Sequence, residues 1–325
     1  MSQEIPFEPF PFFSDPHHQT IISSFFNVLF EPFSERRLIQ LPDGDKLSLE
    51  ITTPSGWKEG DLTVVMVHGL GGSHQSPYLV RLTKRLESLG IRSVRINMRG
   101  CGSGKGLAKQ MYHGGRSEDI FHVILQLKKE LPDAPLLLIG FSLGGNIVLK
   151  MSGELGELAK EFLVGVIAVS PPVDLYSSVV MIGHPENAMY EKYFIGLMRS
   201  DVHYRHKKFR DLPRVRLPRK LKFYEFDQIY TAPQYGFRDA RDYYEKCSAL
   251  QFIPDIALSC KILLAQDDPI VSPSSLDGIA LPKNVDVFKT KRGGHMGYLA
   301  HPSEGKGLYW LDSQLIDWIL GFTNL

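Results

Sequence analysis

Apolar residues along this chain form short continuous runs that alternate with helical periodicities. The runs at 62–67 and 136–139 are apolar throughout, which is typical of strands covered on both faces. Between them, residues 76–89 repeat leucine at helical spacing, and residues 118–131 place aliphatic side chains on one helical face. This alternation of strand and helix predicts right-handed crossovers and a mostly parallel sheet.

A hairpin pattern precedes the alternation, and a long insertion interrupts it. The turn Pro42-Asp43-Gly44-Asp45 predicts a hairpin over residues 36–52, because Asp-Gly suits a reversing turn. Residues 171–256 break the rhythm with aromatic side chains and a basic run. The alternation then resumes with KILLAQ and VDVFKT and ends in an amphipathic helix at about residues 308–320. The expected division of the chain is a core at residues 35–170 and 257–325 and a cap at residues 171–256.

The first 34 residues are rich in Phe and Pro, and residues 20–30 predict a short helix with an apolar face. One interpretation is a membrane-surface anchor. The segment lacks the Lys and Arg that such helices carry on their polar side, so packing on the core is favoured. His17 and His18 have no cluster of partners nearby and are not assigned to a metal.

Composition and charge narrow the class of protein. A chain of 325 residues with 43% hydrophobic residues can bury a large core, and a net charge of +1 gives no overall attraction to nucleic acid. Cys101, Cys247 and Cys260 are scattered and have no metal-ligand spacing, so we expect free thiols in a reducing compartment. We find neither a secretory signal nor an apolar run long enough to span a bilayer, and we therefore expect a cytoplasmic protein.

The stretch PLLLIGFSLGGNIVLK at residues 135–150 carries the clearest chemical motif. An apolar strand runs into the turn Gly140-Phe141-Ser142-Leu143-Gly144, and a helix follows. This G-x-S-x-G elbow exposes a serine hydroxyl on a strained turn, with glycine where any Cβ would collide with neighbouring backbone. The pattern makes Ser142 the candidate nucleophile, and the alternative is a plain turn hydroxyl.

A serine hydroxyl needs a base, and the base needs a group that holds its tautomer. In folds that carry a G-x-S-x-G elbow, the acid and the histidine each follow a late strand of the sheet, in the chain order Ser, acid, His. Asp267 and Asp268 follow KILLAQ, and His295 follows VDVFKT. We predict a triad of Ser142, Asp268 and His295, with Asp267 as the alternative acid.

Two backbone amides are the candidate oxyanion donors. The glycine-rich loop HGLGG follows the strand at 62–67 and leaves amides free to face a ligand. We expect one donor from Leu70 in this loop and the other from Leu143, the residue after the nucleophile. The alternative is a tight turn without a ligand, and the chain has no nucleotide-binding glycine motif.

Taken together, several motifs resemble the AB hydrolase superfamily in its YheT-like branch, the AB hydrolase-4 family. They are HHQT, HGLGG, RGCG, YHGG-x-x-ED, GFSLGGN, FDQIYTAPQYGFRDARDYYEKCSA, DDP and GGHMGY. The resemblance runs from about residue 10 to the C-terminus. It implies an α/β-hydrolase fold with an eight-stranded sheet, a helical cap and carboxylic-ester hydrolase activity, and it carries Ser142, Asp268 and His295 over as the triad. Relatives include short- to medium-chain esterases, lipid hydrolases and alcohol acyltransferases.

We therefore expect a serine esterase that acts on a small-molecule ester and needs no metal or organic cofactor. Acyl transfer to an alcohol and a non-catalytic binding protein of the same fold are the alternatives. The basic run at 203–222 suits a solvated cap surface, with weak contact to anionic lipid as the other interpretation. Acyl length, alcohol part and oligomeric state stay open.

Overall fold

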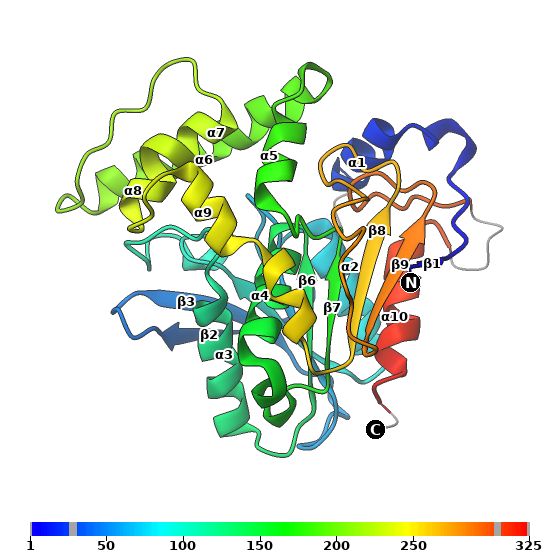
Figure 1. Cartoon of the computed structure of the whole chain (residues 1–325). Helices are drawn as coiled ribbons and strands as arrows, with labels where there is room; N and C mark the ends of the chain where they lie inside the picture. Colours follow the sequence, from blue (N-terminus) through cyan, green and yellow to red (C-terminus); the bar gives the residue numbers. More distant parts are fainter. Residues whose placement is uncertain (1, 26–30, 302–306, 324–325) are drawn as a thin grey trace.

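The computed structural model describes residues 2–25, 31–301 and 307–323. Its strands form one nine-stranded sheet in the order β1-β9-β8-β7-β6-β4-β5-β3-β2 (Figure 1). The strands are β1 (Gln3–Glu4), β2 (Glu35–Gln40), β3 (Lys46–Thr52), β4 (Thr63–Val67), β5 (Arg92–Asn97), β6 (Leu136–Phe141), β7 (Gly165–Val169), β8 (Cys260–Ala265) and β9 (Val285–Thr290).

The sheet is mostly parallel, as predicted. Strand β3 pairs antiparallel with both β2 and β5, and the remaining neighbours pair in parallel. The sheet has nine strands rather than the expected eight, because β1 adds a two-residue parallel strand beside β9. A strand this short leaves no periodic pattern in the sequence.

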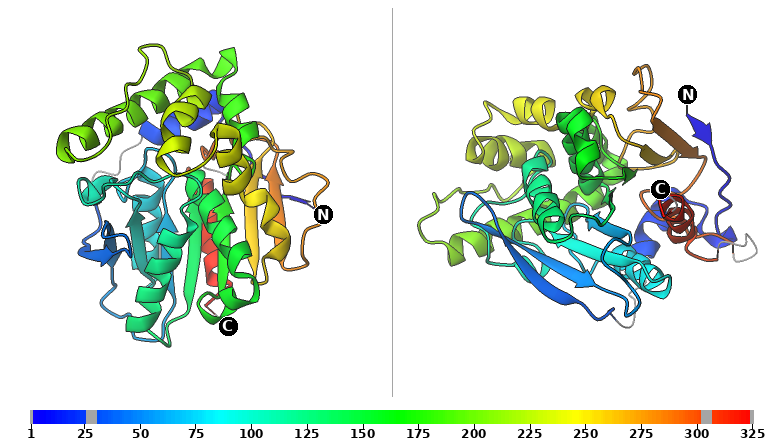
Figure 2. Two further views of the ribbon diagram at one scale, coloured as in Figure 1. Left: turned by 60° about the vertical axis from the view of Figure 1, so that its left-hand side comes forward. Right: turned by 90° about the horizontal axis from the view of Figure 1, so that it is seen from below.

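Helices cover both faces of the sheet and form the cap (Figures 1 and 2). They are α1 (Pro16–Phe25), α2 (Pro77–Ser88), α3 (Ser117–Glu130), α4 (Leu143–Leu155), α5 (Leu175–Ile182), α6 (Ala188–Lys208), α7 (Phe223–Phe226), α8 (Ala232–Gln234), α9 (Ala240–Cys247) and α10 (Trp310–Leu320).

The continuous apolar strands have a direct structural reason. On β4, Val65 and Val67 pack into one core with α3 and α4, whereas Val64 and Met66 pack into a second core with α2 and α10. Both faces of the strand are buried, so the sequence shows no alternation with polar residues.

The N-terminal helix begins earlier than the sequence pattern predicts. The carboxylate of Asp15 accepts the amides of His17 and His18 at 2.8 and 3.0 Å, and Pro16 occupies the first helical position. This cap and proline start α1 at Pro16 rather than at Thr20. The expected end of the helix, at residues 26–30, lies outside the described residues.

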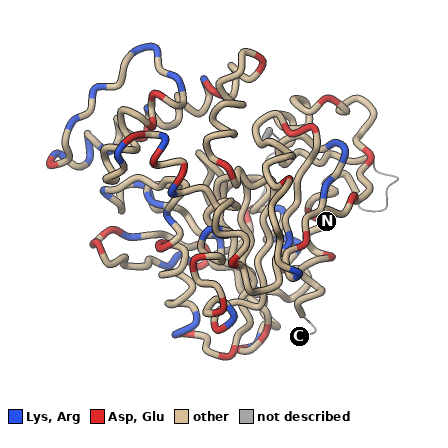
Figure 3. The backbone as a smooth tube through the Cα atoms, in the orientation of Figure 1, with Lys and Arg blue, Asp and Glu red and all other residues tan. Residues whose placement is uncertain are grey.

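Residues 171–256 hold α5 to α9, which extend over the end of the sheet where β6 runs into α4 (Figure 1). Lys and Arg follow the loop between α6 and α7 (Figure 3). In that loop the apolar side chains of Val215, Leu217 and Leu221 pack against the core, while the basic side chains are exposed. Contact of this basic loop with anionic lipid stays a prediction.

Among the described residues, no helix is both long enough and apolar enough to cross a bilayer. All three cysteines are free, and Cys247 and Cys260 are buried. The compartment in which the protein works stays a prediction.

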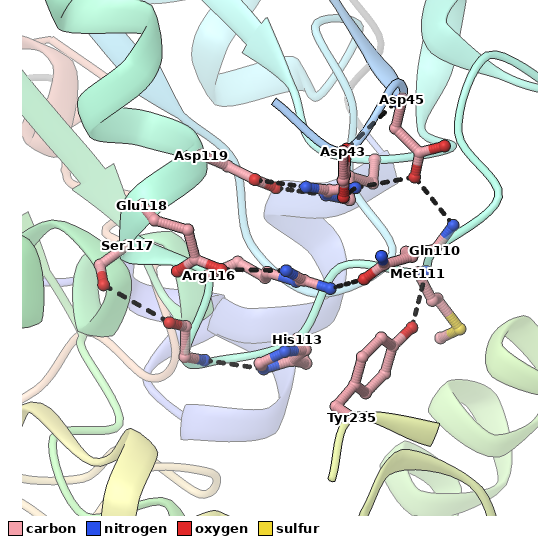
Figure 4. A network of polar contacts seen from close by, with 12 residues as sticks. Asp43, Asp45, Gln110, Met111, His113, Arg116, Ser117, Glu118, Asp119 and Tyr235 are labelled. Carbon is pink, nitrogen blue, oxygen red and sulfur yellow. Dashed lines mark hydrogen bonds and ion pairs between the residues drawn. The ribbon is translucent and has the colours of Figure 1, made fainter. Parts of the chain in front are cut away.

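A buried arginine joins three parts of the chain. The guanidinium of Arg99, which is 2% exposed, donates to both oxygens of Asp119 at 2.6 and 2.7 Å. It also donates to Asp43 and Asp45 at 2.6 and 2.7 Å. Figure 4 shows the carboxylates of Asp43, Asp45 and Asp119 gathered around one point. The cluster fastens the β2–β3 turn to the start of α3.

The same cluster supports the loop that follows residue 108. Asp45 accepts the amides of Lys109 and Gln110 at 2.7 and 2.9 Å, and the Met111 amide donates to the hydroxyl of Tyr235 at 2.6 Å (Figure 4). Tyr235 belongs to the cap. The loop is therefore held by the core on one side and by the cap on the other.

We expect Arg99→Met to lower the free energy of unfolding by about 3–5 kcal/mol, because it leaves buried carboxylates without their cation. Urea denaturation followed by circular dichroism measures the change. The control is Lys160→Met, which removes an exposed ion pair to Glu157 and should have little effect. Equal effects of the two substitutions would contradict this account of the cluster.

Candidate active site

Ser142 sits on a sharp turn between β6 and α4. Its backbone has φ 50° and ψ −120°. Residues other than glycine rarely adopt a positive φ. The Ser142 amide donates to the carbonyl of Val169 at 2.8 Å, and its own carbonyl accepts the amide of Gly145 at 2.8 Å. These bonds to the neighbouring strand and the following helix hold the turn, and α4 begins at the next residue.

Close backbone packing explains the glycines of the motif. A Cβ on Gly140 would lie 2.3 Å from the carbonyl oxygen of Gly144. A Cβ on Gly144 would lie 2.5 Å from the carbonyl oxygen of Val67, at the end of β4. Both distances are far below contact, so the structure confirms the predicted need for glycine on each side of the serine.

The structure brings the three predicted triad residues together. The Nε2 atom of His295 lies 2.8 Å from Oγ of Ser142, and its Nδ1 atom lies 2.8 Å from Oδ2 of Asp268. The side chain of His295 is 9% exposed and that of Asp268 is 1% exposed. Ser142 and His295 are 153 residues apart, and their meeting results from loops that leave the same edge of the sheet.

The two neighbouring aspartates occupy different positions. Oδ1 of Asp268 accepts the amides of Ile270 and Val271 at 2.8 and 2.9 Å, which orients Oδ2 toward His295. Asp267 instead accepts the amide of Gly294 at 2.9 Å, and burial raises the pKa of its carboxyl. Asp268 thus contacts the imidazole, whereas Asp267 contacts the backbone just before it.

The glycine-rich loop after β4 runs directly beside Ser142. A Cβ on Gly69 would lie 3.0 Å from Cβ of Ser142. In this loop the amides of Gly69 and Gly71 donate to the hydroxyls of Tyr78 and Tyr112 at 3.0 and 2.7 Å.

The two amides predicted to bind the oxyanion are free within the described part of the chain. Among the residues that the structure covers, we find no acceptor for the amide of Leu70 or of Leu143. The Leu143 amide also opens α4, so the positive end of the helix dipole lies at the serine. This arrangement suits an oxygen that gains negative charge beside Ser142.

His68 holds the same loop in place and is buried without a charge partner. Its Nδ1–H donates to the carbonyl of Gly69 at 2.7 Å, and its Nε2 accepts the amide of Met98 at 3.1 Å. Burial lowers the pKa of His68 to about 4. The imidazole is therefore neutral at pH 7 and joins the ends of β4 and β5.

A cavity that is partly open to solvent extends from Ser142 and Leu143 into the cap. Its wall is mainly apolar and is built from the cap helices, with Leu175, Val179, Ile182, Phe194, Met198 and Phe226 among the lining side chains. The sequence did not reveal these residues, because their apolar spacing is that of any buried helix.

One acidic group also lines the cavity. Asp227 accepts hydrogen bonds from the hydroxyls of Thr231 and Tyr244 at 2.5 and 2.7 Å. Burial raises the pKa of Asp227 to about 6 despite these bonds. Asp227 lies in the motif FDQIYTAPQYGFRDARDYYEKCSA, but the sequence alone assigned no role to it.

Cys101 lies close to this region, and burial raises the pKa of its thiol. A protonated thiol is a poor nucleophile, so Cys101 is not a candidate for the reaction. Within the described ranges, no group of three or more His, Cys, Asp or Glu side chains is arranged to hold a metal ion.

Comparison with known proteins finds similar sequences among esterases and lipases. A sequence profile of the alpha/beta hydrolase fold matches residues 63–186. The chain is 29% identical to the putative esterase YheT of Escherichia coli K12, over 99% of this chain and 95% of that protein. It is 28% identical to a monoacylglycerol lipase of Saccharomyces cerevisiae, over 79% of this chain and 57% of that protein.

A solved structure agrees on the fold. The Pyrococcus furiosus esterase Pf2001 superposes with a TM-score of 0.56 over 89% of this chain and 93% of its own, at 17% sequence identity. At this identity the likeness concerns the fold alone.

We expect acid to destabilise the protein partly through His68. Between pH 6.5 and 4 the imidazole of His68 is protonated in the unfolded state but stays neutral in the folded state. The free energy of unfolding therefore falls as the pH drops through this range. At pH 4.5 this contribution amounts to about 2–3 kcal/mol. Urea denaturation at pH 7 and 4.5 measures it.

The matched variant is His68→Asn, whose side-chain amide can still donate to Gly69 but does not titrate. Between pH 7 and 4.5 the free energy of unfolding of this variant should fall by about 2–3 kcal/mol less than that of the wild type. An identical pH dependence in both proteins would show that His68 is not the group responsible.

Proposed function

Because this chain belongs to the AB hydrolase superfamily, in its YheT-like family, we propose that Ser142, His295 and Asp268 make it a serine esterase. Ester hydrolysis as a class is common to the relatives, and the protein is a carboxylic-ester hydrolase. The observation that carries the assignment of residues is the chain of two 2.8 Å contacts from Oγ of Ser142 through His295 to Asp268.

The proposed mechanism begins with the tautomer of His295. Nδ1–H donates to Asp268, which leaves the lone pair of Nε2 to accept the Ser142 hydroxyl proton. Oγ of Ser142 attacks the ester carbonyl as its proton passes to Nε2. Asp268 stabilises the imidazolium that results, and two bonds from the backbone amides of Ile270 and Val271 keep its carboxylate oriented.

The carbonyl oxygen becomes an oxyanion in the tetrahedral intermediate. The free amides of Leu70 and Leu143 are the proposed donors to it, and such preorganised donors each contribute about 3–4 kcal/mol to transition-state stabilisation. The intermediate then collapses, and the alcohol leaves with the proton from Nε2. Water attacks the acyl-enzyme with the same histidine as base, which releases the acid and restores Ser142.

The apolar cavity supports an acyl chain as the group that binds beyond the serine. It extends from Ser142 into the cap and is lined mainly by aliphatic and aromatic side chains. Burial of a methylene is worth about 0.8 kcal/mol, so each added carbon should favour binding until the cavity is full. We propose short- to medium-chain acyl or lipid esters as substrates.

A fluorophosphonate probe tests the proposed nucleophile. The wild type should be labelled and should hydrolyse p-nitrophenyl esters, whereas Ser142→Ala should lose labelling and at least about 10⁴-fold of kcat. A folded wild type that is neither labelled nor active would indicate a binding protein. Ethyl ester formed from added ethanol in preference to free acid would indicate an acyltransferase.

The adjacent aspartates give an internal control for the acid. Asp268→Asn should lower kcat by about 10⁴-fold, because the imidazole loses the partner that fixes its tautomer. Asp267→Asn should cost only about 10-fold, through a small displacement of the backbone before His295. The reverse order of effects would assign the role to Asp267.

The acyl-chain assignment predicts a change in specificity when the cavity is narrowed. Val179→Phe, on the cavity wall, should lower kcat/KM for the octanoate ester about 10-fold more than for the acetate ester. The control is Val180→Phe on the same helix, where the side chain is 54% exposed, and it should leave the ratio unchanged. Steady-state kinetics with p-nitrophenyl esters of graded length measures both variants.

A further inference from the structure

The loop that carries His295 has an unfavourable backbone conformation. Met296 and Tyr298 have positive φ values of 62° and 48°, and Gly293 and Gly294 have values of 144° and 56°. Non-glycine residues in this region persist only where surrounding contacts hold them. The loop therefore depends on neighbours outside itself.

One support comes from the core and the other from α1. On the core side, Asp267 accepts the amide of Gly294 at 2.9 Å. On the opposite side, Oγ1 of Thr20 accepts the amide of His295 at 2.9 Å and donates its own hydrogen to the carbonyl of Pro16 at 2.7 Å. The second bond fixes the hydroxyl so that its lone pair faces the histidine.

Gln19, the neighbour of Thr20, holds the end of the same loop. Its side chain is completely buried. The side-chain amide nitrogen donates to the carbonyl of Leu299 at 3.0 Å, and the side-chain oxygen accepts the Leu299 amide at 2.7 Å. The Gln19 side chain thus makes the same pair of hydrogen bonds with the Leu299 backbone that a neighbouring β-strand would make. These two bonds link α1 to residue 299.

The two backbones are in direct contact between these bonds. A Cβ on Gly294 would lie 2.4 Å from the carbonyl oxygen of Pro16, and a Cβ on Gly297 would lie 2.5 Å from the carbonyl carbon of Gln19. Gly294 and Gly297 of GGHMGY are thus required by the approach of α1. The contact joins the HHQT and GGHMGY motifs, although neither motif indicates it alone.

From these contacts we infer that α1 is a clamp on the histidine loop and that Thr20 is a positioning residue for His295. The inference deepens the proposed function and rests on it. The hydroxyl of Thr20 touches no reacting atom in this scheme. It fixes the backbone from which the imidazole reaches both Ser142 and Asp268.

The same helix also touches the cap. Nδ1 of His17 lies 3.1 Å from the hydroxyl of Tyr190 on α6, and the two rings stack with centroids 5.7 Å apart. In Figure 1, α1 lies beyond the ends of β8 and β9, on the side toward the cap. The clamp therefore joins the histidine loop to the helix that carries part of the cavity wall.

The test compares three substitutions within α1. Thr20→Val keeps the shape but removes the hydroxyl, and it should lower kcat about 10-fold with KM unchanged. Thr20→Ser keeps the hydroxyl and should restore wild-type kcat. Ser23→Ala is the matched control, because it removes a hydroxyl whose bond, to the carbonyl of Thr20, stays within the helix; it should behave as wild type.

Three readouts separate positioning from a general loss of structure. The rate of fluorophosphonate labelling of Thr20→Val should fall with kcat, its thermal unfolding midpoint should stay near that of the wild type, and the serine variant should recover both rates. Wild-type kinetics in Thr20→Val would overturn the inference. So would a loss of folded protein in Thr20→Val while Thr20→Ser stays folded, since the contact would then serve the fold as a whole.

The failure of this inference can be told from failure of the proposed function. If the wild type is active and Thr20→Val is equally active, only the clamp is wrong. If the wild type is neither labelled nor active, the esterase proposal is wrong and the clamp falls with it.

Discussion

The conformation of one residue, Ser142, constrains the architecture around it. A non-glycine residue with φ 50° costs about 1–3 kcal/mol, and that cost is met only because the flanking backbone is bonded and packed on every side. The Ser142 amide is bonded to β7, its carbonyl is bonded to α4, and the Gly69 backbone lies against its Cβ. The turn therefore needs the strands beside it before it can expose its hydroxyl.

Parallel strands make the remaining groups available at the same edge. Strands β4, β6, β8 and β9 run in one direction, so the segments after them all begin near the turn. The segment after β4 brings the free amide of Leu70, the segment after β8 brings Asp268, and the segment after β9 brings His295. The sheet thus brings to one edge groups that are far apart in the chain.

How much of this could be predicted depends on whether a feature is local. The strand–turn–helix context of Ser142 and the order of Asp268 and His295 are local patterns, and the sequence was sufficient to place them. The start of α1 was predicted four residues late, because the Asp15 cap and Pro16 decide it and the apolar spacing alone does not. The orientations of Asp267 and Asp268 were also open, since they depend on which backbone amides each carboxylate meets. The role of Thr20 was invisible, because its partner is 275 residues away.

That separation bears on how the protein acquires its reactive arrangement. The Thr20–His295 contact closes a loop of 275 residues, so it cannot form until β9 and the segment after it have been synthesised. Contacts between such distant residues are entropically costly and form late. Helix α1 is therefore synthesised long before its partner, and the bond between Thr20 and His295 completes only after β9 and the loop that follows it are present.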